Sequence, residues 1–181
     1  LTLVTPTANA VPPAPPPNAS CAAATLLTLP ALVSASTAAT TSAQPASACG
    51  VEDDYALWYL FEAPPALEDT SYTFELLAPG GDADLSDTTL ALYRTCEGEA
   101  LACSDDLAFA LTSRIDVYLP AGDQVLVRVA GWGGTRGAFT LRVATTNDVE
   151  RPVNDACQDA IPITQSQPGP AATWNATGTD L

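Results

Sequence analysis

The stretch from Asp123 to Val143 reads DQVLVRVAGWGGTRGAFTLRV. Apolar residues occupy every second position on both sides of a glycine-rich segment, which is the period of a β-strand with one buried face. The intervening residues, Arg128 among them, are predicted to face solvent. The glycines give the connection the backbone freedom of a tight turn, so the stretch is predicted to be a β-hairpin. The alternating apolar residues are Val125, Val127, Val129, Phe139, Leu141 and Val143.

Other segments of the chain show strand patterns of similar length. Residues 54–62 (DYALWYLFE) are apolar on both faces, which is typical of a central strand in a layered structure. Segments 71–77, 89–93 and 114–119 alternate, and 25–29 is predicted to be an edge strand that ends at Pro30. About eight short strands with frequent turn signals predict an all-β fold, a two-sheet antiparallel β-sandwich.

The composition excludes several classes of function. The chain has 181 residues, a net charge of −15 and neither Lys nor His, which disfavours nucleic acid and anionic membrane surfaces as partners. No apolar run reaches membrane-spanning length. Without His or Lys, Ser and Cys nucleophiles lack their usual bases, so we expect no enzyme. A carboxylate pair of the glycosidase kind remains formally open because acidic residues are plentiful.

Two segments near the N-terminus resemble segments near the C-terminus. Leu1-Thr2-Leu3 matches Phe139-Thr140-Leu141, 138 positions later, and the segment around Cys21 matches the one around Cys157, 136 positions later. This spacing indicates a tandem array; chance similarity of short Ala/Thr/Pro-rich pieces is the alternative. We therefore expect residues 1–17 to be the tail of one repeat with a Pro-rich linker. Residues 18–146 are then a complete repeat, and 147–181 a linker and the start of the next.

Five cysteines and no His make a zinc site improbable and favour disulfides in an oxidising compartment. Four of the cysteines lie within the complete repeat and allow three pairings. We favour the local one, Cys21–Cys49 and Cys96–Cys103. Cys157 would then be unpaired within this chain, because its partner would follow Leu181.

Several blocks in order resemble the pre-peptidase C-terminal-like β-sandwich repeats of secreted bacterial proteins. They are NASC, DYALWYLFEAP, DTTLALYRTC, ACSDD and LPAGDQVLVRVAGWGGTRGAFTLRV, and the resemblance covers roughly residues 18–146. It implies a jelly-roll-like sandwich, an extracellular or cell-surface location and a non-catalytic role. It also implies that calcium or an insoluble polymer could be a ligand. The Ala/Pro-rich N-terminal part departs from the family's pattern.

Acidic residues gather in loops that could hold calcium. Calcium takes six to eight oxygen ligands, and a D-x-D-x-x-D loop can point several carboxylates inward. In the fold that the resemblance implies, the loops at Asp87 and at Asp105-Asp106 flank strands that could be neighbours, so we expect them to converge. A solvated acidic surface is the alternative, since the chain is acidic throughout. The candidate calcium ligands are Asp82, Asp84, Asp87, Asp105 and Asp106; Glu52, Asp53 and Asp54 form a further acidic cluster.

Trp132, in the loop between glycines, is the candidate for ligand binding by an aromatic side chain. An exposed Trp there could stack on a sugar ring, although a Trp flanked by glycines more often folds back over the edge of the core.

The function predicted from sequence is that of a non-catalytic extracellular structural or adhesive repeat module. Its partners would be neighbouring repeats of the same protein or identical subunits. One alternative is an accessory module that binds a substrate or carbohydrate for a secreted hydrolase. The other is a filament subunit assembled by strand exchange between terminal segments.

Overall fold

The computed structural model describes residues 14–41, 47, 49, 52–65, 67, 70–77, 84–107 and 110–146. The chain divides into two compact units, Leu1–Thr146 and Asn147–Leu181, and all described residues belong to the first. Asp82, Cys157 and the predicted start of a further repeat lie outside the described residues.

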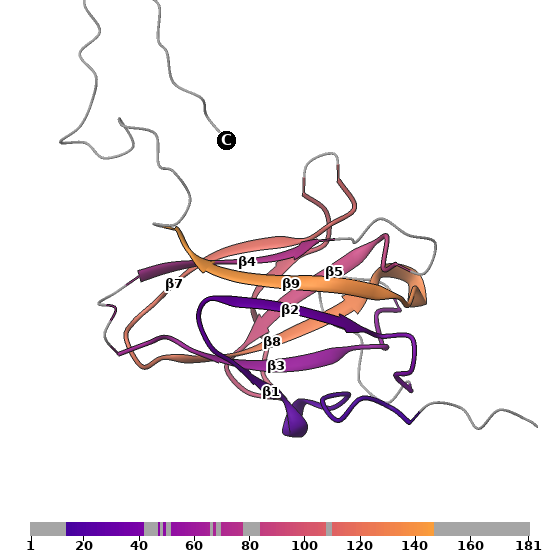
Figure 1. The fold of residues 1–181 in the computed structure, drawn as a ribbon, viewed down its shortest axis with the longest axis horizontal. Coiled ribbons are helices and arrows are strands. Elements are labelled where there is room, and N and C mark those ends of the chain that lie inside the picture. The colour runs from indigo at the N-terminus through magenta and orange to yellow at the C-terminus, as the bar shows by residue number, and fades with distance from the viewer. Residues whose placement is uncertain are drawn as a thin grey trace, which may run out of the picture. The chain divides into compact units, whose positions relative to one another are not determined.

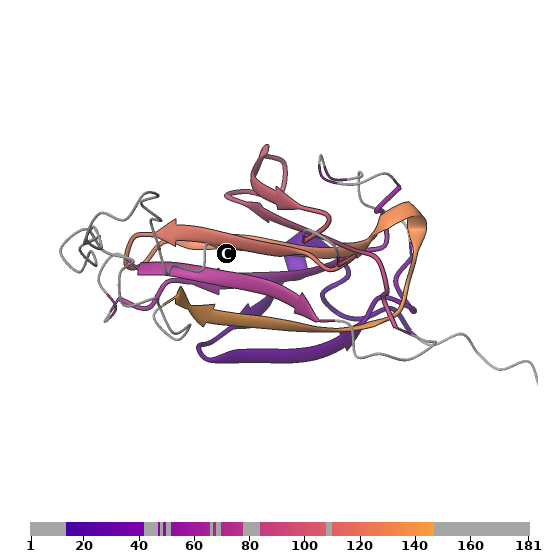
Figure 2. The same cartoon turned by 90° about the horizontal axis from the view of Figure 1, so that it is seen from above.

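In the described part of the chain nine strands form two sheets, and the predicted two-sheet β-sandwich is confirmed (Figures 1 and 2). One sheet, here called sheet A, has the order β1-β3-β8-β5-β6, and sheet B has the order β2-β9-β4-β7. All strand pairs are antiparallel except β1 with β3. The strands are β1 (Thr25–Leu27), β2 (Ala31–Ser36), β3 (Leu57–Glu62), β4 (Thr70–Leu77), β5 (Thr88–Tyr93), β6 (Ala100–Ser104), β7 (Arg114–Leu119), β8 (Gln124–Gly131) and β9 (Ala138–Thr145).

The core lies between the sheets and is filled by the residues that alternate along each strand. Phe61 of sheet A packs edge-on against Tyr72 and Phe74 of sheet B, with ring centroids 5.0 and 5.2 Å apart. The alternating Val residues of β8 and the Phe139 set of β9 are at most 1% exposed. The predicted inward faces of these two strands are therefore correct.

The predicted hairpin between β8 and β9 is wrong. β8 pairs with β3 and β5 in sheet A, whereas β9 pairs with β2 and β4 in sheet B. The glycine-rich connection, which includes the 3-10 turn η2 (Trp132–Gly134), instead crosses from one sheet to the other. Alternation defines which side of a strand is buried, but two facing sheets bury their inner sides equally well, so the pattern is the same in both topologies.

Gly131, at the end of β8, is required by close packing. A Cβ at this position would collide with Thr135 and with the Leu85 side chain. We expect Gly131→Ala to lower the free energy of unfolding by about 2–3 kcal/mol, because the overlap must be relieved by moving the crossing segment. At Gly133 a Cβ meets nothing within 4 Å, and only the left-handed backbone (φ 59°) opposes substitution. Gly133→Ala should therefore cost about 1–2 kcal/mol. Urea unfolding of both variants measures the difference, and equal losses would contradict the packing argument.

The outer face of sheet A carries a second apolar cluster, which explains why β3 is apolar on both sides. Cys21, Trp58, Ala91 and Tyr93 are buried there. Arg128, which alternation predicted to face solvent, lies on this same outer face and is only 2% exposed. That prediction is wrong because Asp53, which is held by Ser47, lies over this face and pairs with Arg128.

Two strands, β2 and β6, were not recognised in the sequence. β2 follows the Leu29-Pro30 bend, where the chain passes from sheet A to sheet B, and its composition of two Ala, two Ser, one Leu and one Val gives little contrast between faces. β6 forms the edge of sheet A, and its residues are all exposed or half-buried. The edge position predicted for β1 is confirmed.

The disulfides join Cys21 to Cys96 and Cys49 to Cys103, so the predicted local pairing is wrong. Cys96 lies in the turn between β5 and β6, whereas Cys103 lies three residues beyond Ala100, which already pairs with Tyr93. Three strand residues span about 10 Å, which exceeds the Cα–Cα distance of about 7 Å that a disulfide can bridge. The observed pairs have Cα–Cα distances of 5.7 and 5.4 Å and attach two N-terminal segments to sheet A.

The described chain enters and leaves the sandwich at opposite ends. In Figure 1 the indigo N-terminal segment approaches from the lower right, and β9 ends at the upper left; Figure 2 shows the same separation along the long axis. Asn18 fixes the N-terminal segment, because its Nδ2 donates to the Trp58 carbonyl and its own carbonyl accepts from the Trp58 amide. Thr146 is held at the other end by a bond from its hydroxyl to the Ser71 carbonyl.

Candidate metal centre

Three carboxylates meet at one corner of sheet A, and we call this set the acidic corner: Asp87, Asp105 and Asp106. Asp87 directly precedes β5, and Asp105 and Asp106 directly follow β6. Because β5 and β6 are antiparallel neighbours, the start of one lies beside the end of the other. One carboxylate oxygen of each residue lies within 4.8 Å of those of the other two. The predicted convergence of these two loops is therefore observed.

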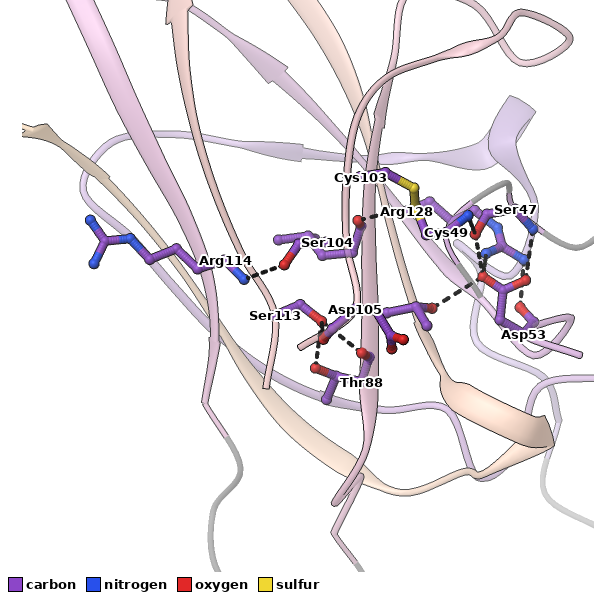
Figure 3. Close-up of a disulfide and its surroundings, with 12 residues drawn as sticks. Ser47, Cys49, Asp53, Thr88, Cys103, Ser104, Asp105, Ser113, Arg114 and Arg128 are labelled. Atoms are coloured by element: carbon purple, nitrogen blue, oxygen red, sulfur yellow. Dashed lines mark hydrogen bonds and ion pairs between the residues drawn. A yellow bond between two sulfur atoms is a disulfide. The ribbon is translucent and has the colours of Figure 1, made fainter. Parts of the chain in front are cut away.

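Ser113 is the hub that holds the acidic corner together (Figure 3). Its hydroxyl lies 2.7 Å from both the Asp105 carbonyl and the Thr88 carbonyl, and 2.8 Å from the Thr88 hydroxyl. The next residue, Arg114, donates its backbone N–H to the Ser104 hydroxyl at 3.1 Å. The start of β7 thus ties the end of β6 to the start of β5. Sequence reasoning missed these hydroxyl residues because nothing in their spacing marks them as partners.

The turn η2 braces the acidic corner from the other side. The Trp132 backbone N–H and the Thr135 hydroxyl both donate to the Asp87 carbonyl at 3.2 Å. A backbone hydrogen bond therefore joins the two kinds of candidate residue, the carboxylate Asp87 and the aromatic Trp132. Trp132 itself is half-buried.

The electrostatics of the acidic corner disfavour three negative charges without a cation. Burial raises the pKa of Asp105, and the charges of Asp106, Asp87 and Asp53 raise it further. Burial, followed by the charge of Asp106, also raises the pKa of Asp87. In addition, the Asp105 Oδ1 atom is buried and accepts no hydrogen bond from the described residues. A buried carboxylate oxygen without a partner costs free energy that a bound cation would recover.

The other predicted ligands do not join this group. Asp84 forms an isolated bridge with Ala138 and lies outside the set of converging oxygens. Asp82 is outside the described residues. Of the cluster at 52–54, Asp53 turns inward and is fully buried, after Glu52 with a left-handed backbone (φ 54°).

Asp53 and Arg128 form a buried ion pair next to the acidic corner. The Arg128 guanidinium donates to Asp53 Oδ2 at 2.5 Å and to the Asp53 carbonyl, and it lies 5.8 Å from the centroid of the Trp58 ring. Asp53 also accepts bonds from the Ser47 amide and hydroxyl and from the Thr89 hydroxyl. Burial raises the pKa of Asp53, but the Ser47 bond and the Arg128 charge outweigh it and hold this pKa below its usual value.

The raised pKa values of Asp87 and Asp105 make the stability of the metal-free protein depend on pH. A carboxyl whose pKa is higher in the folded state binds more protons folded than unfolded. The stability that such a carboxyl contributes is therefore fully present below pH 3.8, its pKa in the unfolded chain. This stability is lost as pH rises through the higher pKa of the folded state.

Asp106→Asn should weaken this pH dependence, because Asp106 is the charge that raises both values. We expect the melting temperature in chelator to rise by about 1–3 °C at pH 7 and to change less near pH 4. Thermal melts between pH 4 and 8 measure the effect. Glu97→Gln, the same charge change in the exposed turn at the opposite end of β5 and β6, is the matched control. A rise of equal size in both variants would indicate general charge repulsion instead.

The protein is therefore a β-sandwich with two disulfides and a cluster of three carboxylates at the end of the β5–β6 edge of sheet A. No family model matches the sequence, and no similar curated protein was found. Among solved structures, the chain is similar to the pre-peptidase C-terminal domain of a collagenase from Bacillus anthracis. The identity is 13% over 67% of this chain and 94% of that chain, with a TM-score of 0.45.

A second similar structure is PliG of Aeromonas hydrophila, a periplasmic lysozyme inhibitor of g-type lysozyme. The identity is 16% over 67% of this chain and 97% of that chain, with a TM-score of 0.39. At these values neither likeness establishes a family or a function. Within the described residues, no helix is long and apolar enough to cross a membrane.

Proposed function

We propose that residues 18–146 form a non-catalytic extracellular structural module, a spacer between neighbouring parts of a secreted or surface protein. The observation that carries the proposal is the path of the chain. The described chain enters at one end of the sandwich and leaves at the other (Figure 1), which suits a module joined in series with its neighbours. Two disulfides fix this unit, and disulfides persist in oxidising compartments outside the cytosol.

A non-catalytic role agrees with the chemistry of the chain. The sequence offers no His or Lys to act as a base, and the interior between the sheets is filled with apolar side chains. The buried ion pair attaches Asp53, and through it Ser47, to sheet A. The carboxylates of the acidic corner therefore remain as groups for binding a cation.

An accessory binding module is the second candidate, and the neighbouring positions of Trp132 and Asp87 favour it. A carbohydrate stacks its faces on aromatic rings and bonds its hydroxyls to carboxylates, so an aromatic and an acidic residue joined by a backbone hydrogen bond suit such a ligand. The filament alternative depends on terminal segments that lie outside the described residues, so the structure adds nothing to it.

Two measurements test the function. Antibody against the 181-residue chain should label intact cells of the source organism and lose its signal after protease treatment of the cell surface. The purified chain should not co-sediment with cellulose, chitin, collagen or peptidoglycan. Signal confined to lysed cells would refute the extracellular role. Saturable binding to one polymer that Trp132→Ala abolishes would replace the spacer by the accessory module.

We further propose that the acidic corner binds calcium and that the ion stiffens the module. The support is the convergence of three carboxylates, one of them with a buried oxygen that lacks a partner. Backbone carbonyls and water would complete the six to eight oxygens that calcium takes. Such an ion would link β5, β6 and, through Ser113, the start of β7.

Calcium should raise the melting temperature of the 181-residue chain. With the affinity common in extracellular modules, a Kd of about 0.1–1 mM, 10 mM calcium adds roughly 1.4–2.7 kcal/mol, or about 4–8 °C. Asp105→Asn and Asp106→Asn should each remove most of this shift, whereas Glu97→Gln should keep it. Magnesium at the same concentration controls for charge screening. An equal shift with magnesium, or no shift with either ion, would contradict the site.

A further inference from the structure

The Cys21–Cys96 disulfide changes the covalent path between the two ends of the module. Cys21 lies just inside the N-terminal end of the described sandwich, and Cys96 lies in the turn between β5 and β6, 75 positions later. A pull applied at the two ends follows the shortest covalent route. That route runs from Cys21 through the disulfide to Cys96 and continues through β6, β7, β8 and β9.

We propose that this disulfide is a tension bypass that keeps β1 to β5 out of the load-bearing path. The inference rests on the proposed spacer role, since a spacer is the kind of module that carries tension. Under load the disulfide limits extension to the part of the chain after Cys96. The 75-residue loop stays closed even when every strand has separated.

The second disulfide does not shorten this path. Cys49–Cys103 joins a residue inside the loop to a residue already on the load-bearing route. Its contribution is to attach the chain around Ser47–Asp53 to β6, beside the buried ion pair (Figure 3). The two disulfides therefore have separable roles, since Cys21–Cys96 sets the limit of extension and Cys49–Cys103 does not.

The load-bearing strands include the centre of both sheets. β8 lies between β3 and β5, and β9 lies between β2 and β4. Their removal leaves β2, β4 and β5 without partners and β1 paired only with β3, but the closed loop keeps these strands tethered near the returning chain. A short closed loop has less conformational entropy than an open chain. The bypass thus limits both the length released and the entropy that refolding must overcome.

Single-molecule force extension of the 181-residue chain tests the proposal, with handles at both termini and Cys157→Ser in every version. The oxidised chain should release about 260 Å less than the same chain in reductant, from 75 residues at roughly 3.3–3.6 Å each. Cys49→Ser/Cys103→Ser should show the same deficit. Cys21→Ser/Cys96→Ser should show a deficit of about 190 Å, because the separation of 54 residues then becomes the limit.

The main comparison is between the oxidised and the reduced form of one and the same chain, so it does not depend on whether a variant folds. A deficit of about 120 Å would indicate the local pairing Cys21–Cys49 with Cys96–Cys103, and no deficit would mean that the disulfide does not form; either result overturns the bypass. A changed deficit in Cys49→Ser/Cys103→Ser also overturns it. Failure of surface labelling would refute the spacer role while leaving these lengths as they are, so the two failures are distinguishable.

Discussion

Arg128→Ala is expected to lower the free energy of unfolding by about 3–5 kcal/mol. The substitution leaves the Asp53 carboxylate, which is 0% exposed, without its cation. It also leaves the Asp53 carbonyl without the guanidinium bond and removes the cation from the Trp58 ring. A domain of this size has only about 5–15 kcal/mol of stability, so the variant should be close to the limit of folding.

Urea unfolding of the oxidised chain measures this loss. Asp53→Asn/Arg128→Met, which removes both charges together, should lose clearly less than Arg128→Ala, because no uncompensated charge stays buried. Arg114→Ala is the matched control, since its partner Asp116 is half exposed and such pairs contribute about 0–1 kcal/mol. A loss for Arg128→Ala no greater than for Arg114→Ala would contradict the importance of the buried pair.

The strands of the fold could be predicted from the sequence because alternation is a local property. The inward sets of β8, β9 and β4 follow directly from period two, and the structure buries them. The assignment of β8 and β9 to different sheets could not be predicted, because both sheets of a sandwich present the same pattern to the shared core. The predicted solvent exposure of Arg128 was wrong for a related reason. Alternation gives the face of a strand but not what covers that face.

The convergence in the acidic corner was expected from the fold that the resemblance implies and not from strand patterns alone, because β6 was not recognised in the sequence. Asp87 precedes β5 and Asp105 follows β6, so strand pairing alone brings them together. The Ser113 hub could not be predicted, since it reaches the corner from sheet B, across the edge of the sandwich. The disulfides were mispredicted for the opposite reason. Short sequence separation favoured Cys96–Cys103, a pair that the length of the β5–β6 hairpin keeps apart.

Removing Cys21–Cys96 is expected to cost about 4.5 kcal/mol in the chain-entropy account, which relates the loss to the size of the closed loop. The loop spans 75 residues, and its opening restores freedom to an unfolded chain that includes five of the nine strands. The folded state also loses the tie that holds the N-terminal segment over Trp58 and Tyr93. Cys21→Ser/Cys96→Ser should therefore retain only a small part of the parent's stability.

Denaturant unfolding of three oxidised chains measures this loss: the parent, Cys21→Ser/Cys96→Ser and Cys49→Ser/Cys103→Ser. The second pair closes 54 residues, for which the same account gives about 4.2 kcal/mol. Entropy alone thus predicts nearly equal losses. Cys49 lies two residues after Ser47, which bonds to Asp53 of the buried ion pair. The Cys49–Cys103 disulfide therefore also holds this part of the chain against β6. A greater loss in Cys49→Ser/Cys103→Ser would show that this disulfide also stabilises the buried ion pair. Losses below about 1 kcal/mol in both variants would contradict the stapling role. Opening loops of this size lowers the free energy of unfolding by more than that, unless the unfolded chain is already compact.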